Sequence, residues 1–170
     1  MKKLIGLSLG IFLAIGISSS ATAQIQVGGG LGFATEIEQL GFQVGGTYVI
    51  NEEIRVAADI IYYLPGDQGQ GIVDVNWFEF NANGHYLFQD DEDLALYGLG
   101  GLNVTRVSID FPENNFFGGG SVSDSEVGLN VGAGLEYGVG FGNLYAEAKY
   151  VLSSADHLAI TGGVRIPIGD

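Results

Sequence analysis

The sequence predicts an all-β protein, namely an eight-stranded antiparallel up-and-down transmembrane β-barrel that follows a cleavable signal peptide. Two observations favour this fold class. An apolar N-terminal stretch ends in a cleavage motif, and about eight later segments alternate apolar with small or polar side chains. A period of two places one face of a strand against an apolar medium and turns the other face away from it. Eight such segments, with both chain ends on one side, are typical of a barrel that crosses a membrane with strands.

The N-terminal stretch indicates export. Two lysines precede the apolar segment Leu4–Ile17, and Ala21-Thr22-Ala23 matches the small-residue site at which a signal peptidase cuts. The apolar segment has 14 residues, which is short of the roughly 18 expected of a spanning helix. We therefore expect a signal peptide over 1–23 and one barrel domain over 24–170, with a retained N-terminal anchor as the less favoured alternative.

The composition narrows the possible functions. The chain has no cysteine, so it has neither disulfides nor thiolate metal sites. Two of the six basic residues lie in the expected signal, which leaves four against 20 acids and a net charge of −16. Such a charge argues against nucleic acid as a partner. We find no catalytic constellation and no cofactor motif, so we expect a protein that is not an enzyme and binds no cofactor.

Eight segments carry the alternation, and most are bounded by glycine, proline or clustered acidic residues that favour turns. In chain order, the expected strands are Gln24–Ala34, Leu40–Ile50, Ile54–Tyr63, Phe78–Phe88, Leu94–Thr105, Val127–Tyr137, Leu144–Leu152 and Ile160–Ile168.

The first four segments show the pattern clearly. Gln24–Ala34 sets Ile, Val, Leu and Phe against Gln and Gly, and Leu40–Ile50 ends at an Asn-Glu-Glu turn. Ile54–Tyr63 sets aliphatic residues against Arg and Asp and is broken by Pro-Gly-Asp. Phe78–Phe88 opposes Phe, Ala, Gly and Tyr to Glu, Asn and His, and ends at a run of acids.

The second four segments are less uniform. The glycines of Leu94–Thr105 obscure which residues of this segment face outward and which face inward. A long polar and aromatic loop is expected over Arg106–Ser125. Val127–Tyr137 sets aliphatic residues against Gly, Asn and Glu, and Leu144–Leu152 sets them against Tyr, Glu and Lys. Ile160–Ile168 opposes Ile and Val to Thr, Gly and Arg.

Alternation alone does not say which face points outward. A soluble periplasmic barrel of the lipocalin type, which binds a small apolar ligand, has the same period with its apolar face inside. In this chain most of the 20 acids fall in turns and loops, whereas an exterior in water would carry charges along its strands. Aromatic residues gather near both strand ends, as in the girdles that flank an apolar band in a bilayer. We therefore expect the apolar face outside and keep the soluble barrel as the alternative.

Charged residues on the other face then point into the lumen. They are Arg55, Asp59, Glu79, Glu136, Glu147, Lys149 and Arg165. Because an unpaired buried charge is costly, we expect them to form a hydrogen-bonded network. The interior of an eight-stranded barrel is only wide enough to be filled by side chains. The network is thus predicted to be a structural brace and not an ion path, with the inward glycines leaving room for long side chains.

The last segment contains Gly163-Val164-Arg165-Ile166-Pro167-Ile168, which is similar to the C-terminal signal read by the barrel-assembly machinery. With this segment the chain resembles the small eight-stranded outer-membrane β-barrel proteins, the OmpX-like, Opa-like and OmpA-barrel-like group of Gram-negative bacteria. The resemblance implies an outer-membrane location, assembly by that machinery and contact with outer-membrane lipids and lipopolysaccharide. It also implies periplasmic turns at 51–53, 89–93 and 138–142. We expect a monomer.

The loop Arg106–Ser125 is the expected place of function. It carries four large apolar residues, Ile109, Phe111, Phe116 and Phe117. A protruding hairpin can bind a partner by strand pairing and aromatic anchors. The simpler interpretation, which we favour, is a flexible hairpin whose apolar residues pack on each other or dip into the outer leaflet. Envelope structure or surface adhesion is therefore the expected role.

Three other groups of residues contain side chains that are common in catalytic or metal sites, but each has a simpler interpretation. The loop Ser153–His157 supplies serine, aspartate and histidine, yet neighbours in one short loop do not adopt a catalytic relay, so we expect a solvated turn. The acidic run at 90–93 lacks the spacing and glycine of a calcium loop. His85 falls on the lumen face, where we expect a hydrogen-bonded structural histidine.

Overall fold

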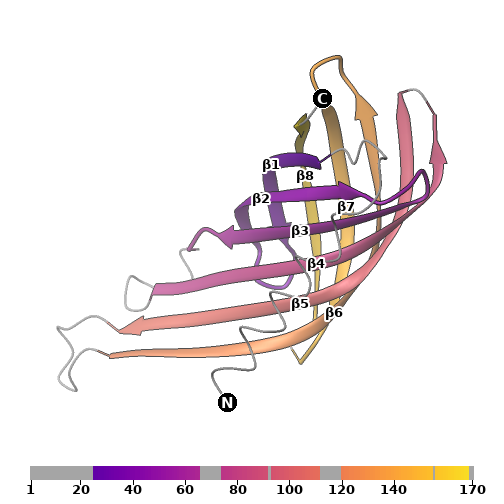
Figure 1. The fold of residues 1–170 in the computed structure, drawn as a ribbon. Coiled ribbons are helices and arrows are strands. Elements are labelled where there is room, and N and C mark those ends of the chain that lie inside the picture. Colours follow the sequence, from indigo (N-terminus) through magenta and orange to yellow (C-terminus); the bar gives the residue numbers. More distant parts are fainter. Residues whose placement is uncertain (1–24, 66–73, 92, 112–119, 155, 169–170) are drawn as a thin grey trace, which may run out of the picture.

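Eight antiparallel strands form a closed barrel in which each strand pairs with the next and the last pairs with the first (Figure 1). The computed structural model describes residues 25–65, 74–91, 93–111, 120–154 and 156–168. The strands are β1 Ile25–Ala34, β2 Gln39–Val49, β3 Ile54–Tyr63, β4 Asp74–Asp90, β5 Leu94–Phe111, β6 Gly120–Gly138, β7 Asn143–Leu152 and β8 His157–Ile168. The predicted barrel is confirmed.

Two further observations concern the N-terminus and helices. The expected signal peptide, residues 1–23, lies outside the described residues. Within the described part of the chain, no helix is long and apolar enough to span a membrane.

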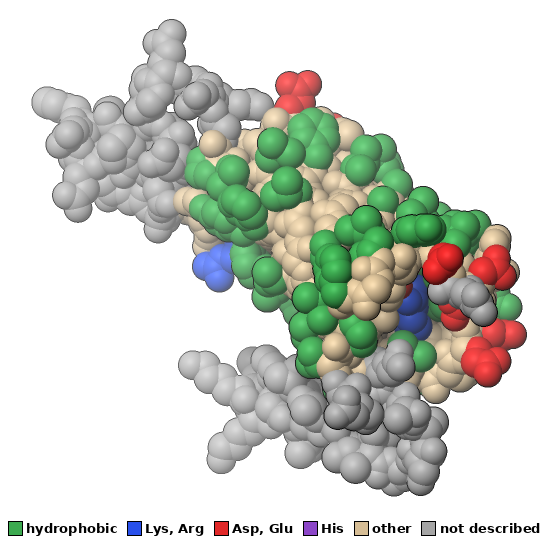
Figure 2. Space-filling model, turned by 90° about the horizontal axis from the view of Figure 1, so that it is seen from above, with side chains coloured by type: hydrophobic (Ala, Val, Ile, Leu, Met, Phe, Trp, Pro, Cys, Tyr) green, Lys and Arg blue, Asp and Glu red, His purple; other side chains and the backbone are tan. Residues whose placement is uncertain are grey.

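The apolar face lies on the outside of the barrel, as the charge distribution predicts. Leu129, Val131 and Leu135 on β6 are 55%, 52% and 42% exposed. Figure 2 shows hydrophobic side chains spread over the wall, with most acidic side chains gathered at one end of the view. A soluble lipocalin-like barrel requires the reverse arrangement, since its exterior faces water. The exterior therefore suits a bilayer.

The strand register places aromatic side chains side by side near one end of the barrel. Phe42 on β2 pairs with Tyr62 on β3, and Tyr62 pairs with Phe78 on β4. All three side chains are exposed. Such a row matches one of the aromatic girdles expected at a membrane interface.

The two ends of the barrel differ. Ile25 at the start of β1 pairs with Ile168 near the chain end, and we call this side the terminal end. The opposite side is the hairpin end, where β4, β5 and β6 run beyond the other strands (Figure 1). The pairing of β5 with β6 continues to Phe111 opposite Gly120. The predicted loop Arg106–Ser125 is therefore wrong in its bounds, because twelve of its residues, at 106–111 and 120–125, are strand.

The structure also settles the facing of β5 and the start of β8. Tyr97 and Leu99 of β5 are buried in the lumen although they are apolar, so both faces of this strand carry apolar residues and the alternation is weak. β8 begins at His157, three residues before the predicted Ile160. The expected solvated turn at Ser153–His157 is thus wrong at its last residue, which is buried.

Candidate functional site

The seven charged residues predicted to face the lumen are all buried. None has more than 9% of its surface exposed, and Glu79 and Lys149 have none. They come from β3, β4, β6, β7 and β8, which surround the lumen. The period of two brings them inward, while the register determines which of them meet.

Arg165 is the centre of the network near the terminal end. Its Nη1 pairs with Glu136, and its Nη2 lies 2.5 Å from Oε1 of Glu147. Tyr97 Oη donates to the same Glu147 oxygen at 2.7 Å and accepts from Arg165 Nη1 at 3.0 Å. The guanidinium also lies over the Tyr145 ring, 4.2 Å from its centroid. One arginine therefore links three other strands across the lumen.

Arg55 joins the same group from the opposite wall. Its Nη1 lies 2.8 Å from Glu136 Oε2, so Glu136 binds two arginines. Its guanidinium lies 4.9 Å from the centroid of the Tyr97 ring. His85 stacks on that ring with the centroids 4.6 Å apart. Neither ring nitrogen of His85 has a hydrogen-bond partner among the described residues, so the expected hydrogen-bonded histidine is wrong and stacking holds it instead.

The middle of the lumen contains a looser pair. Lys149 Nζ lies 3.8 Å from Asp59 Oδ1, and Asn81 donates to the same oxygen at 3.1 Å. Asn130 in turn donates to Asn81 at 2.9 Å. A chain of amides thus connects this pair to its neighbours.

Toward the hairpin end, Glu79 is fully buried and binds a residue that the sequence analysis missed. His157 Nε2 lies 2.8 Å from Glu79 Oε1. Trp77 Nε1 and Asn103 Nδ2 also donate to this carboxylate, each at 3.3 Å. Continuing the period of two back from the inward Thr161 would have placed His157 in the lumen.

The lumen charges would balance with this histidine protonated. Three cations and four carboxylates come from the predicted set. A protonated His157 would supply the fourth cation, next to Glu79. The pairing suits a buried set, because uncompensated charge in a low dielectric is unfavourable.

Inward glycines leave room for the large side chains, as predicted. A Cβ added to Gly134 would lie 2.5 Å from the Tyr97 ring. One added to Gly30 would lie 2.7 Å from Tyr145 Oη, across the neighbouring strand. The two tyrosines that contact Arg165 thus occupy space that any other residue would take.

The hairpin residues singled out by sequence are only partly described. Ile109 and Phe111 belong to β5 and pair with Val122 and Gly120 of β6. Phe116 and Phe117 lie outside the described residues. The aromatic anchors therefore remain a prediction, while the strand pairing of the hairpin is established.

The residue types of a hydrolytic triad do not assemble. Asp156 accepts a hydrogen bond from the backbone N of Ser153 at 2.7 Å, whereas the adjacent His157 points inward to Glu79. In the described part of the chain, no group of three or more His, Cys, Asp or Glu residues could hold a metal ion. The acidic residues at 90, 91 and 93 line the mouth of the terminal end.

Comparisons with known proteins find similarity at the level of fold. No family model and no curated protein matches the chain. Neisserial surface protein A is 20% identical with a TM-score of 0.67 and covers 89% of this chain and 100% of its own. Ail, the attachment invasion locus protein of Yersinia pestis, is 19% identical with a TM-score of 0.57, covering 85% and 97%. A major outer membrane protein from Thermus thermophilus is 11% identical with a TM-score of 0.68, covering 87% and 100%.

These likenesses confirm the fold predicted from the sequence, that of small eight-stranded outer-membrane β-barrels. The apolar exterior agrees with it, because strands that face lipid must carry apolar side chains outward. The fold and the exterior together assign the barrel to an outer membrane.

Proposed function

We propose that this protein is a non-enzymatic outer-membrane barrel whose lumen is closed by its charge network and whose hairpin binds a surface partner. The observation that carries the proposal is the continued pairing of β5 and β6 for six residue pairs, from Arg106 opposite Ser125 to Phe111 opposite Gly120. β4 accompanies this extension as far as Asp74 opposite Asp110, and β7 pairs with β6 only from Leu129 onward. A structured extension at one end is therefore the part of the fold available for interaction.

The lumen supports a bracing role. Tyr63, Tyr97, Lys149 and Glu79 are fully buried inside the barrel. The ion pairs of Arg165 connect β8 to β6 and β7, and His157 connects β8 to β4. Side chains that fill and cross-link the interior stabilise the wall and block passage of solutes. We expect no channel conductance in planar bilayers.

The edge of β6 supports binding by strand addition. β7 pairs with β6 only from Leu129 onward, so residues 120–128 have no partner strand on that side among the described residues. Val122 and Val127 are 63% and 71% exposed. A free edge offers backbone N–H and C=O groups to an extended segment of another protein.

The charge of this edge indicates the kind of partner. Asp124 and Glu126 lie on it, and Asp124 is exposed. Ail has been solved in complex with sucrose octasulfate, a heparin analogue. An acidic edge repels such sulfated sugars, so we propose a neutral or basic polypeptide as the partner of this chain.

Deletion of residues 110–121 tests the proposal. In a Gram-negative host we expect the variant to reach the outer membrane and to keep heat-modifiable gel migration, while adhesion of the host cells to epithelial cells is lost. Replacement of Glu36-Ile37-Glu38 by Gly-Ser-Gly, in another turn at the hairpin end, is the control and should leave adhesion intact. Adhesion that survives the deletion would refute the hairpin role and leave envelope structure as the function.

The structure of the barrel wall supports the proposals on oligomeric state, assembly and lipid contact. The strands close into a barrel whose wall has no open edge apart from the extended segments at the hairpin end, which supports a monomer. Its C-terminal strand and exposed apolar belt support delivery by the barrel-assembly machinery and contact with lipids and lipopolysaccharide. Crosslinking that captures a stable dimer of the full chain in the membrane would contradict the monomer.

A further inference from the structure

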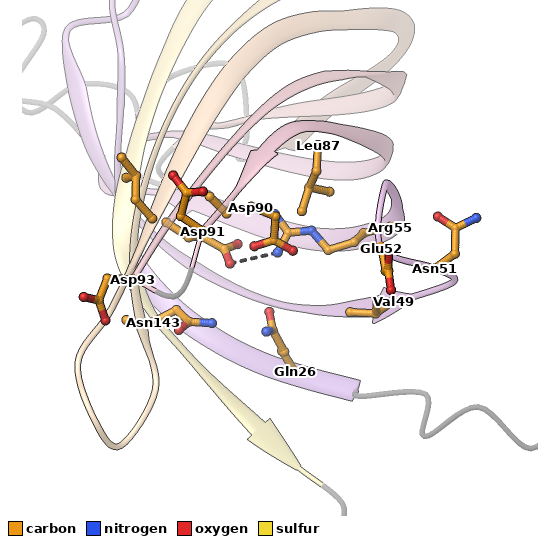
Figure 3. Close-up of a pocket in the computed structure, with 14 residues that line it drawn as sticks. Gln26, Val49, Asn51, Glu52, Arg55, Leu87, Asp90, Asp91, Asp93 and Asn143 are labelled. Atoms are coloured by element: carbon orange, nitrogen blue, oxygen red, sulfur yellow. Dashed lines mark hydrogen bonds and ion pairs between the residues drawn. The ribbon is translucent and has the colours of Figure 1, made fainter.

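A polar cavity of about 220 Å³ opens at the terminal end of the barrel, opposite the hairpin (Figure 3). Residues of β1 to β7 and of the turns between them line it. The bracing network uses only its deepest part, where Glu136 meets Arg55. The rest of the cavity has no role in the function proposed above.

The rim of this cavity is acidic. Glu52, Asp90, Asp91 and Asp93 line it, and all four are exposed. Glu52 lies in the turn between β2 and β3, Asp90 ends β4, and Asp91 and Asp93 lie in the turn between β4 and β5. Figure 3 shows three of these carboxyl groups, those of Glu52, Asp90 and Asp91, around the mouth. A cation approaching this end meets an attractive potential, and a free anion is repelled.

The floor has the opposite character. Arg55 is 4% exposed, and its guanidinium reaches from β3 into the cavity (Figure 3). Glu136 occupies Nη1, but Nε and Nη2 are buried without a hydrogen-bond acceptor among the described residues. Gln26 is 6% exposed, and its Oε1 is buried without a donor. All three atoms are covered by protein, and buried polar groups are normally paired, so the floor holds two donors and one acceptor that a small side-chain movement would offer to an occupant.

We propose that this cavity binds a small zwitterion that carries a carboxylate or phosphate group beside an ammonium group. The anionic group accepts hydrogen bonds from Nε and Nη2 of Arg55, a geometry that suits planar carboxylates and phosphates. The ammonium group donates to Gln26 Oε1 and faces the acidic rim. Both halves of the ligand then meet groups of opposite charge.

Ligands with a single charge fit this site less well. A free anion must pass four rim carboxylates to reach Arg55. A free amine satisfies the rim but leaves the Arg55 donors unmet. A hydrated divalent cation also leaves the Arg55 donors unmet, because the water molecules bound to it point their hydrogens outward and offer no lone pair. The lining residues face the lumen and not the lipid, so the occupant comes from the aqueous phase.

Solution NMR of the full processed chain in lipid-free micelles tests the proposal. The processed chain has three arginines, Arg55, Arg106 and Arg165, so their Nε–H signals are readily assigned by substitution. Titration with L-lysine or O-phosphoethanolamine should shift the Arg55 signal and leave that of Arg106 unchanged. Acetate, butylamine and magnesium, each alone, should bind at least about tenfold more weakly, as expected when one charged contact is lost.

Variants separate the rim from the floor. Asp90→Asn, Asp91→Asn and Asp93→Asn combined should weaken L-lysine binding about tenfold and leave acetate binding unchanged or stronger. Asp124→Asn with Glu126→Gln, on the distant hairpin, is the matched control and should change neither. Gln26→Met keeps the size of the floor and removes its acceptor, so it should weaken L-lysine several-fold even if Arg55→Met does not fold.

Three results would overturn the proposal. The first is equal affinity for L-lysine, acetate and butylamine, or no binding at millimolar concentration. The second is tighter binding of magnesium than of either zwitterion, which would make the rim a cation site. The third is a shift of the Arg55 signal only in nanodiscs that contain phosphatidylethanolamine, which would make the occupant a lipid headgroup. None of these results bears on adhesion by the hairpin.

Discussion

The lumen and the projecting hairpin are built from the same β5 and β6 strands but are held in different ways. Inside the barrel, Tyr97 of β5 and Glu136 of β6 bind Arg165, which arrives from β8. At the hairpin end, the side chain of Arg106 on β5 donates a long hydrogen bond of 3.5 Å to Ser123 of β6, and its backbone pairs with Phe78 of β4. The same pair of strands is thus tied to strands across the lumen by buried side chains at one end, whereas at the other end β4 pairs with β5 and no strand is described on the far side of β6.

From this difference we expect the lumen to determine the stability of the barrel and the hairpin to carry the proposed recognition of a partner. On the proposal that the buried charges brace the wall, a change there is expected to destabilise the whole barrel. An exposed hairpin contributes little to the global free energy of unfolding and is able to change without loss of the fold. The predictions below test that division of roles, from the largest expected effect to the smallest.

Arg165→Met should have the largest effect. It leaves Glu136 with Arg55 alone and removes the cation nearest to Glu147, and breaking a buried pair in this way typically costs about 3–5 kcal/mol. Urea unfolding in micelles, followed by the fluorescence of the single tryptophan, measures the free energy of unfolding. Arg106→Met in the hairpin is the matched control and should lie within about 0.5 kcal/mol of the wild type. Equal losses in the two variants would remove the distinction between lumen and hairpin.

Gly134→Ala should destabilise the barrel by about 1–3 kcal/mol, the usual cost of overpacking. Its Cβ would overlap the Tyr97 ring and push the tyrosine away from Glu147. Gly84→Ala is the control, because the added Cβ points outward and has no neighbour closer than 3.8 Å. The same unfolding measurement decides the matter, and a neutral Gly134→Ala would show that the lumen is not tightly filled.

The Glu79 and His157 pair should show coupling in a double-mutant cycle. Glu79→Gln and His157→Gln each remove one partner of a buried 2.8 Å contact, so the double variant should be less destabilised than the two single losses added together. We expect a coupling free energy of about 0.5–3 kcal/mol, as for residues in direct contact. Additive losses would mean that His157 packs beside Glu79 without stabilising its charge.

The alternation of side chains predicted the wall, but the pairing of charges needed the register. Parity alone placed Arg55 and Arg165 in the lumen, since each lies between outward apolar residues. It could not show that both meet Glu136, because strands distant in sequence determine that meeting. His157 was missed because it follows a short polar segment, and such a segment indicates a turn.

The extension of the hairpin was missed for a different reason. Hydrophobic periodicity reports a strand only where its two faces meet different surroundings. Ser123, Asp124 and Ser125 are all exposed, so no alternation marks them as strand. The part of the chain that we propose as functional is thus the part in which the sequence carries the weakest structural signal.

Hydrogen exchange along β6 should show the contrast within a single strand. Amides at 129–137 lie between two partner strands, whereas those at 120–127 pair with β5 alone. We expect the second group to exchange at least about tenfold faster, through openings that leave the barrel folded. Val122→Ala should speed exchange in the hairpin and change the global free energy of unfolding by no more than about 0.5 kcal/mol. Uniform protection along β6 would mean that the hairpin is held as firmly as the wall, and its separation from the braced lumen would then fail.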